Sequence, residues 1–343
     1  MEFWGSTAGH GLTLLLLAAL LLSAAAEPVD ILQMPEEPMH GSGATSFVPV
    51  RAEGLRKRMK LFIGIPSLHE HGDLRAAARE TWIPIVKASH AVTMRFFCWV
   101  DTQDDGLMAW MRSEQAEHRD MVIVTPESLG GRGTVEKQSW QTRMTINLLS
   151  TAMEHFEPEY IMRAADNAYP NIPVIMRMLK QQRGQGTFWY GHAMPGVILD
   201  GRYDRTPEYK ELWEDTVESP VIPQYMDGAG AVMSAKVGEA LLAAERSVGL
   251  RMLANADAAI GLWLSAFQMR YINETQAGCS VRPFQPAVEG GEDAEWTEAE
   301  GSVLCLSHEM PLAVVHPLTP DLMRKVLTTA AACGDTLSDR NRD

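Results

Sequence analysis

The chain contains only four cysteines in 343 residues, and no two of them form a CxxC pair. Zinc ribbons and thioredoxin-like redox motifs, which depend on such pairs, are therefore excluded. A chain of this length can bury a stable core without disulfides. The thiols are either buried or joined in one or two disulfides, and their spacing does not assign a pairing. They are Cys98, Cys279, Cys305 and Cys333.

Three glycine motifs of common α/β enzymes are also missing. No GxGxxG follows the first apolar run, and neither a Walker A motif nor a GxSxG nucleophile elbow occurs. Dinucleotide oxidoreductases, P-loop NTPases and α/β-hydrolases are therefore disfavoured. The charge balance disfavours a further class, because a net charge of -14 opposes binding to the phosphate backbone of nucleic acids.

The clearest break in composition is the uncharged run at residues 11–26. Its length falls between the core of a signal peptide and a membrane-spanning helix of about 20 residues. Ala24 and Ala26 fit the small-x-small pattern of signal peptidase, whereas the residues before the run lack Lys and Arg. Residues 1–26 are predicted to be either a cleavable signal peptide or a signal anchor.

The remainder divides into three parts. Residues 27–55 are rich in Pro, Gly and Ser, which predicts an extended stem. Residues 56–333 alternate short apolar runs with helical patterns, which predicts one α/β domain with a mainly parallel sheet flanked by helices. Residues 334–343 are polar, and we predict a disordered tail.

The apolar patterns place individual elements within this domain. Strands are predicted at residues 61–65, 94–100, 120–125, 159–166 and 230–234. Helices are predicted at residues 73–87, 134–156, 172–182, 235–247 and 257–266. Asp73 and Asn171 are the expected N-caps of two of these helices. Because α/β sheets bind ligands at the ends of strands, the acid that ends the strand at 159–166 is a candidate site residue.

Several blocks resemble one enzyme family in the same order along the chain. RAAARETW at residues 75–82 resembles the arginine-rich signature of the inverting β-1,3-galactosyltransferases, and Lys137 takes the place of a family lysine. YIMRAADNAYPN at residues 160–171 resembles the YVLKTDDDVFVN strand. The later blocks are QYMDGAGAVMS (224–234), NADAAIGLWL (255–264) and HPLTPDLM (316–323). The resemblance implies a single GT-A domain that uses a UDP-sugar.

The resemblance also implies roles for particular residues. Asp257 would be the general base that takes a proton from the acceptor hydroxyl. A Mn²⁺ ion would be bound by Asp166, Asn167 and His316. The UDP-sugar donor would be held by Arg75, Arg79, Lys137, Asp166, Gly228 and Gly230.

The candidate metal site departs from the family pattern. Where the family has three successive acids, this chain has Ala165, Asp166 and Asn167, and Ala256 replaces the acid before Asp257. The lost charges should weaken metal binding. Two functions stay open. One is an inverting hexosyltransferase that moves galactose from UDP-galactose to a glycan or glycoprotein. The other is a catalytically impaired relative that binds glycans or partner proteins.

Each candidate side chain also has a purely structural alternative. Asp166 could be a turn acid, Asp257 a helix N-cap, and His316 a hydrogen-bonded core histidine. Arg75 and Arg79, at i and i+4 on one helix face, could form ion pairs instead of binding phosphate.

The resemblance and the N-terminal run also imply a cellular location. A type II Golgi membrane protein with a lumenal domain is expected if residues 1–26 are an anchor, and a protein of the secretory lumen if they are cleaved. In either compartment, the Asn273 sequon would be an N-glycosylation site.

Overall fold

The computed structural model describes residues 56–100, 104–126, 139–198, 221–253, 255–273, 280–283 and 312–332. These residues belong to one compact unit, Leu55–Asp343. The predicted signal segment, stem and tail lie outside the described residues, as do Lys137 and three of the four cysteines. The fourth, Cys98, is a buried free thiol. No helix in the described part of the chain combines the length and the apolar composition that crossing a membrane requires.

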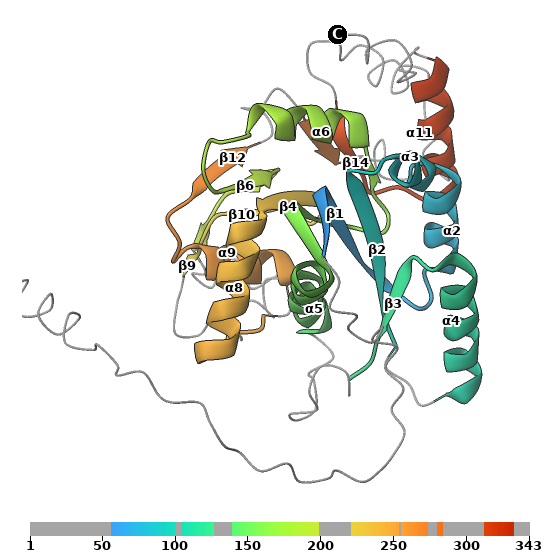
Figure 1. Ribbon diagram of the computed structural model, residues 1–343, viewed down its shortest axis with the longest axis horizontal. Helices are drawn as coiled ribbons and strands as arrows, with labels where there is room; N and C mark the ends of the chain where they lie inside the picture. Colours follow the sequence, from blue (N-terminus) through green and yellow to red (C-terminus); the bar gives the residue numbers. More distant parts are fainter. Residues whose placement is uncertain are drawn as a thin grey trace, which may run out of the picture. The chain divides into compact units, whose positions relative to one another are not determined.

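A seven-stranded sheet forms the centre of the domain (Figure 1). Its strands, in chain order, are Lys57–Leu68 (β1), Val92–Trp99 (β2), Met121–Val124 (β3), Phe156–Ala164 (β4), Phe188–Gly191 (β6), Gly230–Ser234 (β11) and Arg270–Asn273 (β12). The spatial order is β12-β6-β11-β4-β1-β2-β3. β11 runs antiparallel to both of its neighbours, and the other pairings are parallel.

Helices cover both faces of this sheet. They are Gly72–Glu80 (α2), Ile83–Ala88 (α3), Asp105–His118 (α4), Trp140–His155 (α5), Ile172–Gln181 (α6), Ala235–Val248 (α8), Ala256–Leu264 (α9) and Pro320–Ala332 (α11). Side chains of α5, α8 and α9 share one apolar cluster with the sheet, whereas those of α2, α3, α6 and α11 share a second cluster. The predicted α/β architecture, a mainly parallel sheet flanked by helices, is confirmed.

The two clusters arise from the alternation of side chains along the strands. In β4, Ile161 lies in the cluster with α5, while Tyr160 and Met162 lie in the cluster with α2. Successive residues of a strand point to opposite faces, so an apolar run without alternation is buried on both sides. The apolar run at 61–65 and the largely apolar run at 94–100, which Arg95 interrupts, therefore lie in interior strands of the sheet.

Smaller sheets flank the main one. β13 (Ser280–Pro283), β14 (Leu312–His316) and β5 (Tyr169–Pro170) form a sheet in the order β13-β14-β5. β7 (Ala193–Met194) pairs with β10 (Tyr225–Met226), and β8 (Val197–Ile198) pairs with β9 (Val221–Ile222). The backbone N–H of Leu318 also donates to the carbonyl of Asn167 at 2.9 Å. These contacts bring the end of β14 beside the turn that follows β4.

The predicted helix at residues 73–87 is wrong in one respect, since the chain forms two helices, α2 and α3, with a break at Thr81 and Trp82. Pro84 explains the break, because proline lacks an N–H and its ring clashes with the carbonyl four residues earlier. Asp73 is also not the N-cap of α2; His71 holds that position, and Asp73 lies in the first turn. Asn171 is confirmed as the N-cap of α6, where its side chain accepts from the N–H of Val174.

The helix α4 was not among the predicted elements. Its only described buried side chain is Met111, so the sequence shows no apolar stripe of helical period. The signal that was present is a capping one: Asp104 accepts hydrogen bonds from the N–H groups of Gly106 and Leu107 at 2.8 and 3.1 Å. Such a cap favours a helix start without requiring amphipathicity.

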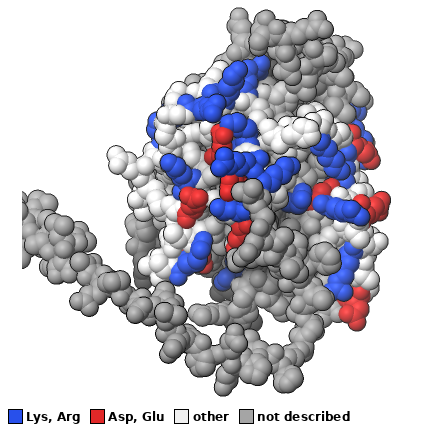
Figure 2. Space-filling model, in the orientation of Figure 1, with Lys and Arg blue, Asp and Glu red and all other residues white. Residues whose placement is uncertain are grey.

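The surface charge of one face differs from the composition of the chain. Among the described residues, Lys and Arg are more prominent than Asp and Glu on the face shown in Figure 2, although the net charge is -14. Interstrand ion pairs such as Arg58 with Glu157 contribute to the mixed pattern elsewhere on the surface. The net charge of the sequence therefore does not describe each face of the domain.

Candidate active site

A cavity of about 320 Å³ lies at the carboxyl ends of β1 and β4. Ligands of α/β folds bind at this end of the sheet, where loops from neighbouring strands meet. The lining comes from residues 66–68 and His71 after β1, Trp140 and Gln141 at the start of α5, residues 163–167 around the end of β4, residues 227–229 before β11, Asp257 in α9 and His316 in β14. The cavity thus brings together distant parts of the chain.

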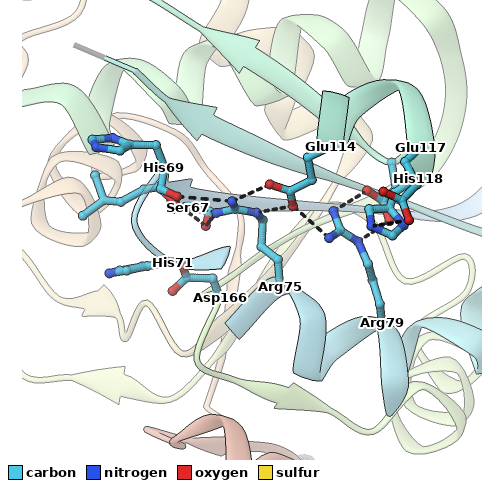
Figure 3. Close-up of polar contacts among 11 residues, drawn as sticks. Ser67, His69, His71, Arg75, Arg79, Glu114, Glu117, His118 and Asp166 are labelled. Atoms are coloured by element: carbon cyan, nitrogen blue, oxygen red, sulfur yellow. Dashed lines mark hydrogen bonds and ion pairs between the residues drawn. The ribbon is translucent and has the colours of Figure 1, made fainter. Parts of the chain in front are cut away.

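Asp166 lies in the turn after β4, with 11% of its side chain exposed. Its Oδ2 lies 2.7 Å from Nδ1 of His71, and Figure 3 shows the two side chains facing each other. An ionised carboxylate can only accept, so the imidazole is the donor. The hydrogen bond to Asp166 raises the pKa of His71, against the opposing effect of burial. One of the predicted site acids is therefore hydrogen-bonded to an imidazole whose protonation it favours.

Asp257 lies in the first turn of α9, with 23% of its side chain exposed. Its Oδ1 accepts a hydrogen bond from Nη1 of Arg163 at 2.6 Å. Burial raises the pKa of Asp257, whereas Arg163 acts in the opposite direction. The N-cap of α9 is Asn255, which accepts from the N–H of Asp257, so the capping alternative for Asp257 is wrong. Its carboxylate is available to the cavity.

His316 and Asp227 complete the set of ionisable side chains around the cavity. His316, at the end of β14, is half-buried, and burial lowers the pKa of its imidazole despite nearby carboxylates. The neutral imidazole is the form that ligates a metal. Asp227 precedes β11, and its Oδ1 accepts from the N–H of Ala229 at 2.8 Å. Both side chains face a common space with Asp166 and Asp257.

Arg75 does not take the predicted role of a phosphate ligand. Its side chain is fully buried, and all five N–H donors of its guanidinium meet protein acceptors. Nε and Nη2 donate to the two carboxylate oxygens of Glu114, each at 2.8 Å, and the other donors reach Ser67, Leu68 and His69 (Figure 3). Arg75 has no N–H donor left to bind a diphosphate. The alternative in which Arg75 forms ion pairs is therefore the one that the structure shows.

Arg79 belongs to the same network. It donates to Glu114 at 2.8 Å and to both oxygens of Asp120 at 2.9 and 3.0 Å, with only 11% of its side chain exposed. Neither Arg75 nor Arg79 lines the cavity. The i and i+4 spacing correctly placed both arginines on one helix face, but that face packs against the acids of α4 and the residue before β3.

The two candidate glycines have different surroundings. Gly228 lines the cavity, and a Cβ at this position would lie 2.4 Å from Oδ2 of Asp257. Gly230 is buried in β11, where a Cβ would lie 2.8 Å from both Met162 and Val314. Gly230 therefore permits tight packing in the core and does not face a donor, which corrects its predicted role.

The candidate metal ligands face the cavity, but the set carries little negative charge. Asp166, Asn167 and His316 all line it. A carboxylate, an amide oxygen and an imidazole suit Mn²⁺ in kind. In the described part of the chain, however, no three His, Cys, Asp or Glu side chains are grouped closely enough to hold an ion. The only carboxylate of the set also bonds to His71. These donors fit a weakly bound metal better than a tightly bound one.

Two further predicted residues remain predictions. Lys137 lies outside the described residues. Asn273 ends β12, half-buried, and its Oδ1 is buried with no hydrogen-bond partner among described atoms. The other two residues of its sequon also lie outside the described residues.

The sequence reasoning did not single out Arg163, His71, Asp227 or Trp140 as site residues. A weak signal existed for Arg163, which is a charged residue near the end of an otherwise apolar strand. Asp227 directly precedes Gly228 in the block QYMDGAGAVMS, which resembles a family motif. His71 and Trp140 carry no spacing that distinguishes them from packing or surface residues. They line the cavity because β1 ends, and α5 begins, beside it.

Comparison with known proteins gives a match over most of the domain. A family model described as Galactosyltransferase matches residues 73–275. The chain is 26% identical over 240 residues to "Probable beta-1,3-galactosyltransferase 12" of Arabidopsis thaliana, covering 67% of this chain and 59% of that protein. It is 23% identical over 210 residues to "Hydroxyproline O-galactosyltransferase GALT2" of the same plant, covering 61% of this chain and 28% of that protein. The chain thus spans less than two thirds of the length of either relative.

Solved structures show only distant likeness. A mannosyltransferase of Pyrobaculum calidifontis in complex with GDP-mannose and Mn²⁺ aligns over 64% of this chain and 56% of that one, with 14% identity and a TM-score of 0.35. The galactosyltransferase LgtC with donor and acceptor sugar analogues aligns over 78% of this chain and 95% of that one, with 10% identity and a TM-score of 0.37. Since both scores lie below 0.5, family membership rests on the sequence match.

Proposed function

The chain belongs to the galactosyltransferase family, and from this premise we propose that it is an inverting hexosyltransferase that moves galactose from UDP-galactose to a hydroxyl of a glycan or glycoprotein. The names of its relatives support a β-1,3 linkage and a protein-linked acceptor. The identity of the acceptor is proposed and is not a finding, because the chain spans only part of the length of those relatives.

One observation carries this proposal. Asp166, Asp257 and His316 come from three separate sequence blocks, and all three line the same cavity at the carboxyl end of the sheet. These are the residues to which the family resemblance assigned metal binding and base catalysis. Three residues with unrelated structural roles would not be expected to line the same cavity.

In the proposed reaction, Asp257 takes the proton of the acceptor hydroxyl. The hydroxyl oxygen attacks the anomeric carbon, and the bond from that carbon to the diphosphate oxygen breaks, so that UDP leaves with the electron pair. Attack from the side opposite to the leaving group inverts the anomeric configuration. In the structure, the carboxylate of Asp257 accepts a hydrogen bond from Arg163.

The residues that would hold Mn²⁺ are Asp166, Asn167 and His316. When bound, the ion would supply positive charge to the diphosphate as UDP departs. His71, whose raised pKa favours the imidazolium, adds positive charge on the same side of the cavity independently of the metal. We also retain the proposal of a Golgi or secretory-lumen location, which is supported by the composition of residues 1–26.

A second function is favoured by a specific observation. Ala165 and Asn167 remove two carboxylates, and the described part of the chain contains no close group of three metal-ligating His, Cys, Asp or Glu side chains. A protein that binds a UDP-sugar or glycan without turning it over would share the cavity but not the reaction. The two functions differ in turnover and not in fold.

Calorimetric titration of UDP into the purified full chain, first with Mn²⁺ and then with excess chelator, tests the proposal. We expect binding with Mn²⁺ and much weaker binding after chelation. Release of UDP from UDP-galactose is then measured for the wild type and for Asp257→Asn, whose amide cannot accept the proton. A folded protein that binds no UDP under either condition would refute the transferase proposal, and UDP binding without any turnover would favour the second function.

A further inference from the structure

Arg163 occupies an unusual position for a charged residue. It lies near the end of β4, the strand between β1 and β11, with only 11% of its side chain exposed. Among the described residues that line the cavity, it is the only Lys or Arg. Its hydrogen bond in the described part of the chain goes to Asp257, while its Nε is buried without a partner. A buried guanidinium with few partners is costly to fold, so its place here calls for a reason.

The arrangement around Arg163 and Asp257 requires a residue without a side chain at position 228. A Cβ on Gly228 would lie 2.4 and 2.9 Å from the two carboxylate oxygens of Asp257 and 3.0 Å from Nη1 of Arg163. Carbon atoms do not approach oxygen this closely, and a side chain there would separate the ion pair. The backbone N–H of Gly228 also donates to Asp257. Three segments, β4, the turn before β11 and α9, therefore meet at one carboxylate.

The other charged groups near Asp257 show why the contact with Arg163 matters for its ionisation. Asp227, from the turn before β11, opposes ionisation of Asp257, and burial acts in the same direction. His316, from β14, has a lowered pKa and is favoured in its neutral form. Arg163 is thus the fixed cation among the groups that face Asp257. A general base must be both ionised and correctly oriented to accept a proton.

We propose that Arg163 is the positioning residue of the site, holding the carboxylate of Asp257 toward the cavity, and that Gly228 provides the space for this contact. This inference rests on the proposed function in that it takes Asp257 as the proton acceptor. Arg163 itself touches neither reacting atom in this role.

Carbon-13 NMR of aspartate carboxyl groups tests the contact without any substrate. The full chain is labelled at the aspartate carboxyl carbons, and the Asp257 resonance is assigned by its loss in Asp257→Asn. We expect the titration midpoint of Asp257 to move to higher pH in Arg163→Met, because the guanidinium stabilises the ionised form. Arg163→Lys should restore most of the difference. Arg95→Met, which removes an arginine of β2 that does not line the cavity, should leave the midpoint unchanged. An unchanged midpoint in a folded Arg163→Met protein would overturn the proposal.

Kinetics separate positioning from binding of the donor. With UDP-galactose, Arg163→Met should lower kcat by about 100-fold, the scale expected for misplacement of a catalytic group. The KM for the donor and the calorimetric affinity for UDP should stay within about twofold of the wild type. The acid limb of the pH profile of kcat should move to higher pH, which loss of folded protein alone would not cause. A fall in UDP affinity as large as the fall in kcat would contradict positioning and assign Arg163 to donor binding.

A pair of glycine variants provides a matched test. Gly228→Ala should displace the carboxylate and reproduce both the higher titration midpoint and the loss of kcat. Gly230→Ala perturbs core packing against Met162 and Val314, so it should lower stability without moving the midpoint. If wild-type turnover is absent, the transferase proposal fails, whereas the NMR comparison still decides whether Arg163 holds Asp257.

Discussion

Two groups of ionic side chains in this domain are both largely buried but differ in how completely their hydrogen bonds are satisfied. In the α2–α4 ion-pair cluster, made of Arg75, Arg79, Glu114 and Asp120, exposed fractions of the side chains range from 0% to 11%. Arg163 in the cavity is exposed to 11%. Every donor of Arg75 has a protein acceptor, yet Arg163 makes one hydrogen bond in the described part of the chain.

This difference shows that burial alone does not separate a structural charge from a functional one. A saturated ion pair has no donor left for a ligand, so its contribution is to stability. An unsaturated charge beside a cavity costs stability, and such a cost is expected at functional sites. The arginines of the RxxxRETW signature fall in the first class, and the less conspicuous arginine of β4 falls in the second.

The largest effect should come from Asp257→Asn. If Asp257 is the general base, kcat for UDP-galactose falls by about 10²- to 10⁴-fold. The affinity for UDP should change little, because the amide has nearly the same shape, whereas the midpoint of urea denaturation should fall because Arg163 loses its carboxylate partner. Turnover that survives this substitution would mean that another group accepts the proton.

Glu114→Gln should have the opposite profile. It removes the carboxylate shared by two buried arginines, and breaking a buried pair in this way costs about 3 to 5 kcal/mol. The free energy of unfolding, measured by urea denaturation, should fall while UDP affinity per folded molecule stays unchanged. Glu80→Gln is the matched control, since it breaks only an exposed pair with Arg324 and should have little effect. A selective loss of UDP binding in Glu114→Gln would show that this cluster contributes to donor binding.

A smaller effect is expected from Asn167→Asp, which restores one carboxylate to the candidate metal site. Additional negative charge strengthens binding of a hard cation. The affinity for UDP in the presence of Mn²⁺ should rise by about tenfold, roughly 1.4 kcal/mol, while affinity in excess chelator should not rise. Asp166→Asn should act in the opposite direction. Equal affinities with and without Mn²⁺ in all three proteins would remove the metal from the proposal.

The smallest effect should come from the pH dependence of the pair formed by His71 and Asp166. Because folding raises the pKa of His71, the pair stabilises the fold fully below the ordinary histidine pKa of about 6.5 and loses this contribution as pH rises through the raised value. In excess chelator, the wild type should therefore exceed His71→Gln in stability by more at pH 6 than at pH 8. A difference that is the same at both pH values would show that folding does not shift the pKa of His71.

Much of the framework could be predicted from the sequence because it depends on local patterns. Apolar runs, alternation and the Asn171 cap are short-range features, and the five predicted strands and most of the predicted helices lie where these features placed them, whereas β6, β12 and α11 were not predicted. The break between α2 and α3 was missed although Pro84 was visible, because the apolar periodicity continues across it. The helix α4 was missed because it buries a single described side chain.

By itself, the sequence determined the class of fold and the family blocks, and it singled out Asp166, Asp257 and His316, which the structure brings to one cavity. Only the tertiary structure decided which charged side chains pair with each other. Arg75 pairs with Glu114, 39 positions away, and Arg163 pairs with Asp257, 94 positions away. The physical reason is that a guanidinium donates hydrogen bonds to whichever carboxylate the packing of the sheet and helices brings within about 3 Å, and no local pattern encodes that distance.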